Sequence, residues 1–277
     1  MTRPTAGVAF KPQHFDEAIA TSAAGLWFEV HAENYMVAGG PRLTMLEALR
    51  EARPLSLHGV GLSLGGAERP DPVHLRALGN LVDRFDPFLV SEHLAWSRIG
   101  ARCLPDLLPV PRTGEALATV VRNIDIAQET LGRRILIENP AHYVELDAMW
   151  SEPDFLAEIV HRTGCGLLID VNNVAVAANN LGYDAGRYLA QLPHDAIGEI
   201  HVAGNSEDPL LGANLLIDSH DAPVSEEVWC LLAALIDHAG ERPVLLERDG
   251  DVPDFVDLMA ERGRAAAILA RKVPCHA

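Results

Sequence analysis

Imidazole and carboxylate side chains recur at the ends of short apolar runs in this sequence. The runs LSLH, LVSEH, ILIE, GLLID, GEIH and VLLE each finish on such a residue. These residues are His58, His93, Glu138, Asp170, His201 and Glu247. A polar side chain that ends a buried run costs free energy unless it finds a partner. Imidazoles and carboxylates without thiolates are typical of sites for iron, manganese or zinc ions.

There are more of these donors than one ion can bind. We therefore expect two or three ions that share a bridging carboxylate. Each residue taken alone is explained more simply as a hydrogen-bonded buried group. The same placement at the end of six runs nevertheless favours a metal site. Glu92 and Asp249 lie beside these residues in the sequence, and from that position we expect them to carry protons in a reaction.

Eight apolar runs are candidates for the buried strands that position these side chains. They span residues 7–10, 26–31, 55–60, 88–93, 135–139, 166–171, 198–203 and 243–248. Segments with helical periodicity lie between them, and the clearest are residues 113–131, 151–163 and 225–239. Gly132 and Gly240 are placed to end the first and third of these helices. Ser151 and Asp154 form a capping signature at the start of the second.

This alternation predicts a TIM (β/α)₈ barrel. Eight strand–helix units in roughly 250 residues match the size of that fold, and continuous apolar strands are typical of a parallel sheet covered by helices. An open doubly wound sheet is the alternative, and the lack of a G-x-G-x-x-G after the first run disfavours it. No linker divides residues 1–277, so we expect one domain. The strand ends of such a barrel converge on one face, where its enzymes have their active sites.

The composition excludes several classes of protein. The chain has 277 residues, with 22 Lys plus Arg against 39 Asp plus Glu, which gives a net charge of −17. Such a surface repels nucleic-acid phosphates and anionic lipids, so neither is expected as a partner. With 48 % apolar and 22 % charged residues, the composition is that of a globular protein. No segment has the apolar length of a secretory signal or a membrane span, so we expect a cytoplasmic protein.

Weaker signals surround the expected site. Trp96 and Arg98 follow His93 closely and are candidates to contact substrate, since an arginine pairs well with a carboxylate. A packed aromatic ring and an exposed charge explain these two residues equally well. The histidines in or beside helical stretches, such as His14 and His74, are expected at the surface.

Seven segments resemble a known family, in order along the chain. LSLHGVGLSLG, LVSEHLAWS, DLLPVP, ILIENPAHY, GLLIDVNNV, GEIHVAG and LLIDSHDAPV are similar to the multinuclear non-haem iron-dependent oxidases, the family of the methanobactin-biosynthesis oxidase. The resemblance implies a xylose-isomerase-like TIM barrel that holds two or three irons, as Fe²⁺ and Fe³⁺. It further implies O₂-dependent oxidation of cysteine or other residues in a ribosomally made precursor peptide. A small partner protein that recruits the peptide is also implied.

The resemblance assigns ligands to three ions by position. The first set is His58, His93 and Glu138, with Glu138 as the bridge to a second ion. The second set is Asp170, Asn173, His201 and Glu247. The third ion would be held by Asp218 and His220. The implied mechanism is oxidative, with a substrate thiolate at one iron and O₂ at its neighbour.

Two positions near the expected site depart from the family pattern. Asn205 stands where the family often has His, and Arg248 stands where it often has Trp. Neither change removes an assigned metal ligand. Both bear instead on substrate contacts, and we take Asn205 and Arg248 as candidate substrate-binding residues.

Two other functions stay open at the level of sequence. One is a redox-silent isomerase or hydrolase that uses zinc or manganese on the same barrel, which metal analysis would distinguish from an iron oxidase. The other is a non-catalytic peptide-binding scaffold. In a scaffold, replacing Glu138 or His201 with alanine would leave peptide affinity intact, whereas an enzyme would lose metal and turnover.

Overall fold

Eight parallel strands close into a barrel in the computed structural model, which describes residues 5–100 and 102–271. The barrel strands are β1 (Ala6–Ala9), β2 (Phe28–His31), β3 (Leu55–Gly59), β4 (Leu89–His93), β7 (Leu136–Glu138), β8 (Gly166–Asp170), β9 (Ile197–Val202) and β12 (Val244–Leu246). Their order around the barrel is β1-β12-β9-β8-β7-β4-β3-β2, and β1 pairs with both β2 and β12. Each strand overlaps one of the eight predicted runs, so the TIM barrel is confirmed and the open sheet is wrong.

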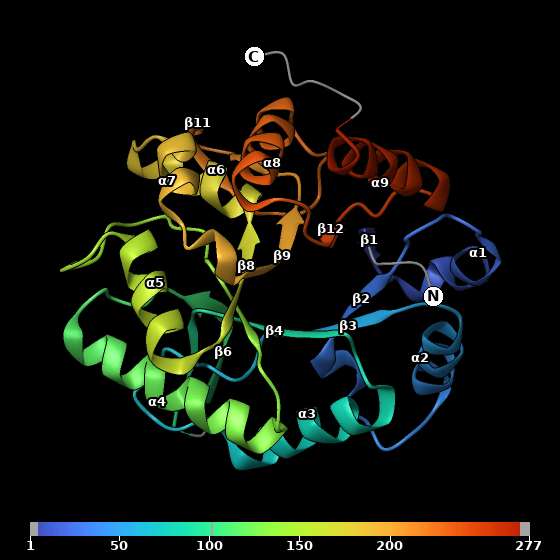
Figure 1. Ribbon diagram of the computed structural model, residues 1–277, viewed down its shortest axis with the longest axis horizontal. Helices are drawn as coiled ribbons and strands as arrows, with labels where there is room; N and C mark the ends of the chain where they lie inside the picture. The colour runs from blue at the N-terminus through green and yellow to red at the C-terminus, as the bar shows by residue number, and fades with distance from the viewer. Residues whose placement is uncertain (1–4, 101, 272–277) are drawn as a thin grey trace.

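Helices surround the barrel on its outer side (Figure 1). They are α1 (Phe15–Ala20), α2 (Pro41–Ala52), α3 (Pro72–Phe85), α4 (Gly114–Leu131), α5 (Glu152–Thr163), α6 (Val171–Leu181), α7 (Ala185–Gln191), α8 (Glu226–Ala239) and α9 (Phe255–Leu269). Short 3₁₀ helices are η1 (Pro12–His14), η2 (Ala32–Tyr35) and η3 (His194–Ala196). Within the part of the chain that the structure describes, no helix combines the length and the apolarity needed to cross a membrane.

The three helices expected most clearly begin and end where the sequence indicates. The Thr113 hydroxyl accepts a hydrogen bond from the backbone N–H of Ala116 at the start of α4, and Gly132 ends that helix with φ 63°. A left-handed residue at this position is the usual way to satisfy the last carbonyls of a helix. Ser151 and Ser225 cap α5 and α8 in the same manner as Thr113. Local polar chemistry therefore sets the helix boundaries.

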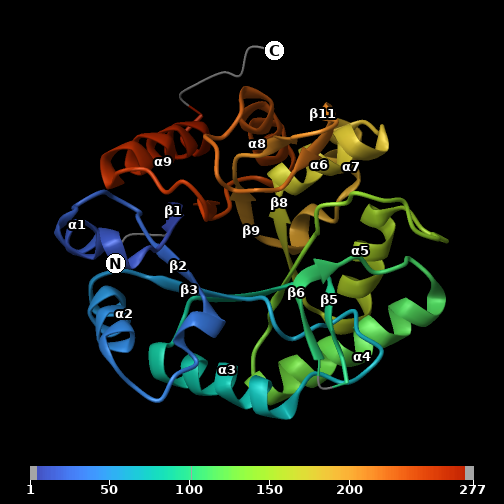
Figure 2. The same ribbon diagram turned by 180° about the vertical axis from the view of Figure 1, so that it is seen from behind.

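Two antiparallel hairpins interrupt the strand–helix alternation. One joins β5 (Trp96–Ile99) to β6 (Arg102–Leu108), and the other joins β10 (Ser206–Asp208) to β11 (Gly212–Ile217). Figure 2 shows β5 and β6 side by side, between β3 and α5 in that view. The sequence predicted only connecting segments here, because neither hairpin has the continuous apolar pattern of a buried barrel strand. Both hairpins follow barrel strands, β4 and β9, and so lie at the end where the polar residues are.

Candidate metal centre

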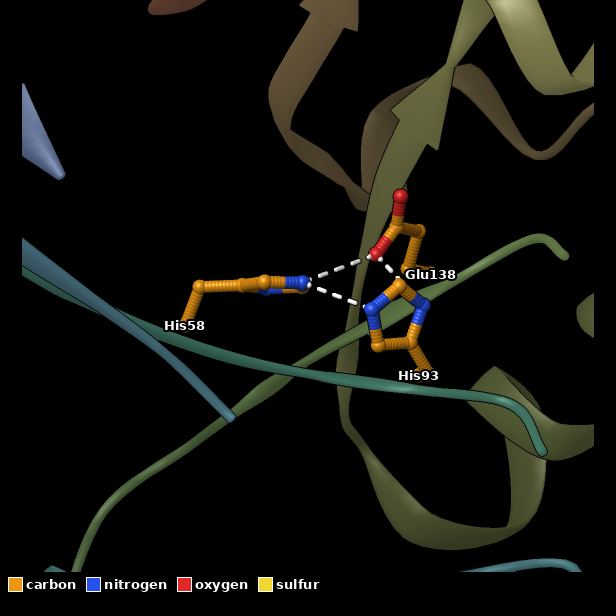
Figure 3. Close-up of side chains that lie close together, drawn as sticks. All are labelled: His58, His93 and Glu138. Carbon is orange, nitrogen blue, oxygen red and sulfur yellow. Dashed lines mark hydrogen bonds and ion pairs between the residues drawn. The ribbon is translucent and has the colours of Figure 1, made fainter. Parts of the chain in front are cut away.

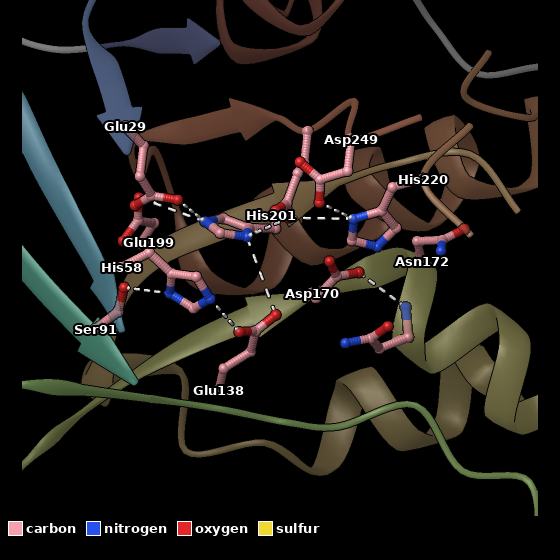
Figure 4. A network of polar contacts seen from close by, with 12 residues as sticks. Glu29, His58, Ser91, Glu138, Asp170, Asn172, Glu199, His201, His220 and Asp249 are labelled. Atoms are coloured by element: carbon pink, nitrogen blue, oxygen red, sulfur yellow. Dashed lines mark hydrogen bonds and ion pairs between the residues drawn. The ribbon is translucent and has the colours of Figure 1, made fainter. Parts of the chain in front are cut away.

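The polar residues that end the barrel strands meet inside the barrel (Figure 4). Successive residues of a strand point to opposite faces, so the inward positions of one strand lie two residues apart. On β7 and β8, and on β12 with the residue that follows it, the first inward residue is leucine and the next is acidic. The pairs are Leu136 and Glu138, Leu168 and Asp170, and Leu245 and Glu247, all buried. These three strands therefore place carboxylates one pleat step above buried leucines.

His58, His93 and Glu138 form the first group of candidate ligands (Figure 3). Glu138 Oε2 lies 3.2 Å from His58 Nε2 and 3.0 Å from His93 Nδ1. The Nε2 atoms of the two histidines lie 2.9 Å apart. Ser91 Oγ lies 2.8 Å from His58 Nδ1, which leaves His58 Nε2 directed at the other two residues. One ion with bonds of about 2.0–2.2 Å could be held at such a convergence.

Glu138 also belongs to a second group, with Asp170 and His201. His201 Nδ1 lies 4.0 Å from Glu138 Oε1 and 3.2 Å from Glu247 Oε2. All four residues are buried, with at most 4 % of any one exposed. Glu138 thus turns one carboxylate oxygen toward each group. That is the arrangement a bridging carboxylate needs.

His220 extends the network beyond the barrel strands, after β11. Its Nε2 lies 2.7 Å from Asp218 Oδ1 and its Nδ1 lies 3.5 Å from Glu247 Oε2. Asn172 Nδ2 donates a hydrogen bond of 2.7 Å to the same Asp218 oxygen. Asp170, His220 and Glu247 make up a third group of converging donors. Glu247 is consequently close to two groups, as Glu138 is.

Unpartnered buried atoms at this centre test whether metal ions fit it. Asp170 Oδ2 and Asn173 Oδ1 are buried and make no hydrogen bond within the described residues. Such groups carry a full desolvation cost unless something satisfies them. Carboxylate and amide oxygens with imidazole nitrogens suit divalent iron, manganese or zinc. The residues present therefore fit a cluster of divalent cations.

Burial and neighbouring charges shift the pKa values at the centre. Burial acts to raise the pKa of Glu138, but His93 and His58 outweigh it and hold that pKa well below its ordinary value. Burial acts to lower the pKa of His93, but the Glu138 charge raises it to about 9. Burial, with the charges of Asp218 and Glu138, raises the pKa of Asp170 to about 7. Protonated imidazoles thus balance the buried carboxylates, and bound cations would balance them in the same way.

The two residues expected to carry protons lie in different surroundings. Glu92 is buried on the opposite pleat face from His93, and its carboxylate accepts hydrogen bonds from the backbone N–H groups of Leu62 and His93. Burial raises the pKa of Glu92 to about 8. Asp249 lies at the edge of the centre, where it accepts a 2.6 Å hydrogen bond from Lys11 Nζ and lies 3.4 Å from His220 Nδ1. Only Asp249 therefore adjoins a candidate ligand side chain.

A cavity of about 670 Å³ opens beside the centre. His93, Asn173 and Asp218 line it from the side of the centre. Arg98 and Tyr143 are among its other lining residues. A cavity of this volume admits a side chain and the adjacent backbone of a peptide. A molecule bound in it would reach the candidate ligands directly.

Of the four expected substrate-binding residues, one lines the cavity and three do not. Arg98 lines the cavity, where it pairs with Asp71 at 2.8 Å. Asn205 Nδ2 donates a hydrogen bond to Asn172 Oδ1, and Asn172 in turn donates to Asp218. Trp96 donates from its indole to the Pro109 carbonyl, outside the cavity lining.

Arg248 is buried against α9 rather than directed at the cavity. Its Nη2 lies 2.9 Å from Glu261 Oε2, and only 5 % of the residue is exposed. The family-pattern argument therefore does not place this side chain at a substrate. Among the expected substrate contacts, only Arg98 adjoins the cavity.

Several residues at the centre were not in the expected ligand sets. Glu29 and Glu199 lie beside His201, and His31 lies 3.3 Å from Glu247. The two-residue spacing of Glu29 to His31 and of Glu199 to His201 is the signal that could have identified them, because it puts both members on the inward face.

Two histidines expected at the surface are not there. His74 pairs with Glu33 at 3.1 Å and lines the cavity. His14 is only 6 % exposed and its ring packs on Phe255. His14 lies in the short helix η1 and His74 in the first turn of α3, and neighbouring side chains contact both of them. The expectation was wrong because helical periodicity alone does not show which face another element packs on.

Comparison with solved structures identifies related folds. The chain superimposes on endonuclease IV from Thermus thermophilus with a TM-score of 0.62 and 18 % identity, covering 98 % of this chain and 100 % of that one. D-psicose 3-epimerase from Clostridium cellulolyticum gives a TM-score of 0.60 and 13 % identity, covering 97 % and 98 %. Identities this low show the fold alone. They support the expected xylose-isomerase-like barrel type. A similar solved structure, from Mycobacterium smegmatis, is described as a xylose isomerase-like TIM barrel protein.

Sequence comparison identifies much nearer relatives. A UPF0276 protein of Caulobacter vibrioides is 60 % identical over 268 residues, which is 96 % of this chain and 95 % of the relative. A UPF0276 protein of Chromobacterium violaceum is 47 % identical over 264 residues, 95 % and 94 % of the two chains. The model of the family described as RiPP precursor modification enzyme MbnB/TglH/ChrH matches residues 5–270. The chain therefore belongs to this family of enzymes that modify ribosomally made precursor peptides.

Proposed function

We propose that the protein is a multinuclear iron-dependent oxidase that modifies a cysteine of a precursor peptide with O₂. The observation that carries the proposal is the sharing of two buried carboxylates, Glu138 and Glu247, among three converging groups of donors. Shared carboxylates bring ions close enough to act on one substrate together. Membership of a family of precursor-peptide modification enzymes supports a peptide as that substrate.

The proposed ligand sets follow the geometry. His58, His93 and Glu138 would hold one ion, and this set adjoins the cavity through His93. The second ion would be held by Glu138, Asp170, His201 and Glu247, with Asn173 Oδ1 as a further donor. A third would be held by Asp218 and His220 beside Glu247. Two or three irons are thus proposed.

Iron would supply the one-electron redox capacity and the reactivity toward O₂ that no side chain here has. The chain itself would fix the geometry and limit access of water. Asn173 and His93 face the cavity and would direct a bound side chain at the centre. Asp249, held by Lys11 at the edge of the centre, is the residue we propose to accept or return a proton. Glu92 faces a backbone turn and is left out of this proton role.

The charge of the cavity favours a neutral or basic peptide. Glu33, Asp71, Asp106 and Asp218 line it, while Arg98 and His74 are each paired with one of these carboxylates. An acidic lining attracts cationic groups and repels anionic ones. We further propose that a small partner protein recruits the peptide, as the resemblance to the family of oxidases implies.

The test combines metal loading with peptide turnover. The full chain would be loaded anaerobically with Fe²⁺ or with Zn²⁺ and mixed with a Cys-containing precursor peptide encoded beside its gene, together with any small protein encoded there. The iron form is expected to consume O₂ and to change the peptide mass, and the zinc form to do neither.

Two results would contradict the proposal. Purified protein that holds only zinc or manganese, with no iron-dependent O₂ uptake, would favour the redox-silent isomerase or hydrolase. A Glu138→Ala variant that keeps both peptide affinity and biological output would favour the non-catalytic scaffold. Neither outcome is compatible with an iron oxidase.

A further inference from the structure

A second layer of polar side chains lies one pleat step below the candidate ligands. Glu29 of β2, Ser56 of β3 and Glu199 of β9 occupy inward positions where β7, β8 and β12 carry leucine. Their exposed fractions are 2 %, 0 % and 0 %. Polar groups this deep are kept only where they satisfy one another or a neighbour. The ligand sets proposed above do not use any of the three.

His201 links this layer to the centre through its two ring nitrogens. Nδ1 lies 3.2 Å from Glu247 Oε2, on the side of the candidate ions. Nε2 lies 3.1 Å from Glu29 Oε1 on the opposite side. Figure 4 shows the His201 imidazole between Glu29 and Glu138. Nδ1 therefore faces the proposed ligand sets, while Nε2 faces a buried carboxylate outside those sets.

Glu29 is itself held in place by the lower layer. Ser56 Oγ donates a 2.8 Å hydrogen bond to Glu29 Oε2, and Glu29 and Ser56 are directly paired in the β2–β3 register. Glu199 Oε1 lies 3.7 Å from His201 Nε2, and neither oxygen of Glu199 makes a hydrogen bond within the described residues. The hydrogen-bonded Glu29 is thus the nearer and better fixed of the two carboxylates.

His58, in the first group, has a different kind of support. Its Nδ1 faces the neutral hydroxyl of Ser91 at 2.8 Å, from the position that pairs with His58 in the β3–β4 register. A carboxylate behind a metal-bound imidazole fixes the ring and also strengthens it as a donor, whereas a hydroxyl mainly fixes the ring. The barrel therefore supports its two deepest candidate ligand histidines unequally.

We propose that Glu29 is a positioning residue, which holds the His201 imidazole with Nδ1 toward the centre and strengthens it as a metal ligand. This inference rests on the metal centre of the proposed function and adds a residue that its ligand sets do not contain. Ser56 acts through Glu29, because it fixes the oxygen that does not face His201. Outer carboxylates of this kind typically change metal affinity about 10–100-fold when they are replaced.

Cobalt(II) titration of the metal-free full chain tests this role, with visible absorption as the readout. Glu29→Gln keeps the shape and an acceptor oxygen but removes the charge. It is expected to lower the affinity for one of the bound Co²⁺ ions by about 10–100-fold and to change the visible absorption of that ion. Glu29→Asp, which keeps the charge, is expected to restore part of the affinity. Ser56→Ala is expected to act in the same direction more weakly, and it serves if Glu29→Gln does not fold.

Two matched controls separate positioning from general damage. Ser91→Ala should affect the equivalent held by His58 and leave the His201 equivalent unchanged. Glu145→Gln removes an exposed carboxylate and should change neither equivalent. Thermal unfolding of every metal-free variant shows whether the fold is retained.

Two outcomes would overturn the inference. In the first outcome, the Glu29→Gln and Ser56→Ala variants both bind Co²⁺ with the affinity and absorption of the parent chain. Glu29 would then not act on His201. In the second outcome, the Glu199→Gln and Glu29→Gln variants each bind one Co²⁺ ion fewer than the parent chain. These carboxylates would then be metal ligands themselves. The readout here is cobalt binding and not turnover. A chain that binds cobalt as expected but oxidises no peptide would therefore contradict the proposed function and leave the role of Glu29 supported.

Discussion

At the scale of single residues, Glu138 is the side chain on which most of the proposed centre depends. Its two oxygens face different groups, with His58 and His93 on one side and His201 on the other. Only 1 % of the residue is exposed, so water does not compensate its charge. A group in this position affects the occupancy of two sites together.

Glu138→Gln is expected to lower the affinity for both of the first two ions, because the amide has one neutral oxygen in place of two charged ones. We expect a loss of more than about 100-fold at each, since a direct ligand matters more than the outer residues for which 10–100-fold is usual. Metal content after dialysis against a weak chelator measures the effect. Glu145→Gln is the exposed control, and a variant that lost only one ion would contradict the bridging role.

His74 and Glu33 give a prediction on pH at the same scale. The hydrogen bond with Glu33 raises the pKa of His74 above 6.5. Burial acts to raise the pKa of Glu33, but the bonds from His74 and the Val60 N–H outweigh it and hold that pKa below 4.5. A raised histidine pKa stabilises the fold fully below 6.5 and loses that effect as pH rises through the folded-state value. The lowered glutamate pKa stabilises above 4.5.

His74→Gln is therefore expected to lower the free energy of unfolding most between pH 4.5 and 6.5, the ordinary values of the two groups. The loss should be up to about 1 kcal/mol, as for other partly exposed ion pairs, and should shrink as pH rises further. Urea unfolding across this range measures it, with the exposed His161→Gln as control. A loss that is the same at every pH would show that charge is not the cause.

At the scale of elements, helix α4 fixes the loop that follows β3 and lines the cavity. Asn123 of α4 is fully buried, and its Nδ2 donates to the carbonyls of Leu64, Gly66 and Glu68 at 3.0, 3.0 and 3.1 Å. The sequence showed Asn123 only as a polar position in an amphipathic helix. Its partners lie 55 to 59 residues earlier in the chain, so helical periodicity could not reveal them.

Asn123→Ala is expected to destabilise the fold by roughly 1–3 kcal/mol, the cost of leaving buried groups without their hydrogen-bond partner. It should also loosen the Val60 and Gly61 side of the cavity. Chemical unfolding gives the first quantity, and hydrogen exchange of the loop gives the second. Glu129→Ala, at an exposed position of the same helix, is the control. An unchanged exchange rate in the loop would refute the link between α4 and the cavity wall.

At the scale of the whole molecule, the net charge bears on whether a nucleic acid can be a partner. Endonuclease IV shares the barrel at 18 % identity, which shows the fold alone. The net charge of −17 repels a phosphate backbone wherever the acidic surface meets it. Barrel closure pairs β1 with β12, residues that are more than 230 positions apart in the chain. We still predict a single domain.

The protein is accordingly expected to bind duplex DNA more weakly than roughly 10⁻⁴ M at physiological salt, the weak limit of non-specific binding. Fluorescence anisotropy with a labelled duplex measures this, with the metal-loaded chain tested alongside the metal-free one. Affinity in the micromolar range that falls steeply with salt would contradict the argument from charge. It would also reopen a nucleic acid as substrate.

The sequence alone determined the barrel and the types of residue at its mouth. Apolar runs, helix caps and the two-residue pleat period are local properties. Strands β3, β7 and β12, and the residues His58, Glu138 and Glu247 at or beside their ends, could therefore be located from the sequence. The hairpins after β4 and β9 were missed, because they have no continuous apolar pattern.

Only the tertiary structure decided which of these residues act together. Contacts such as Glu29 with His201 join residues far apart in the chain, and they depend on the register of neighbouring strands and on closure of the barrel. The same closure turned Arg248 toward α9 and placed His74 at the cavity. The sequence gives the type of each side chain. Its partner depends on how all eight barrel strands pack together, and a local sequence pattern carries no information about that packing.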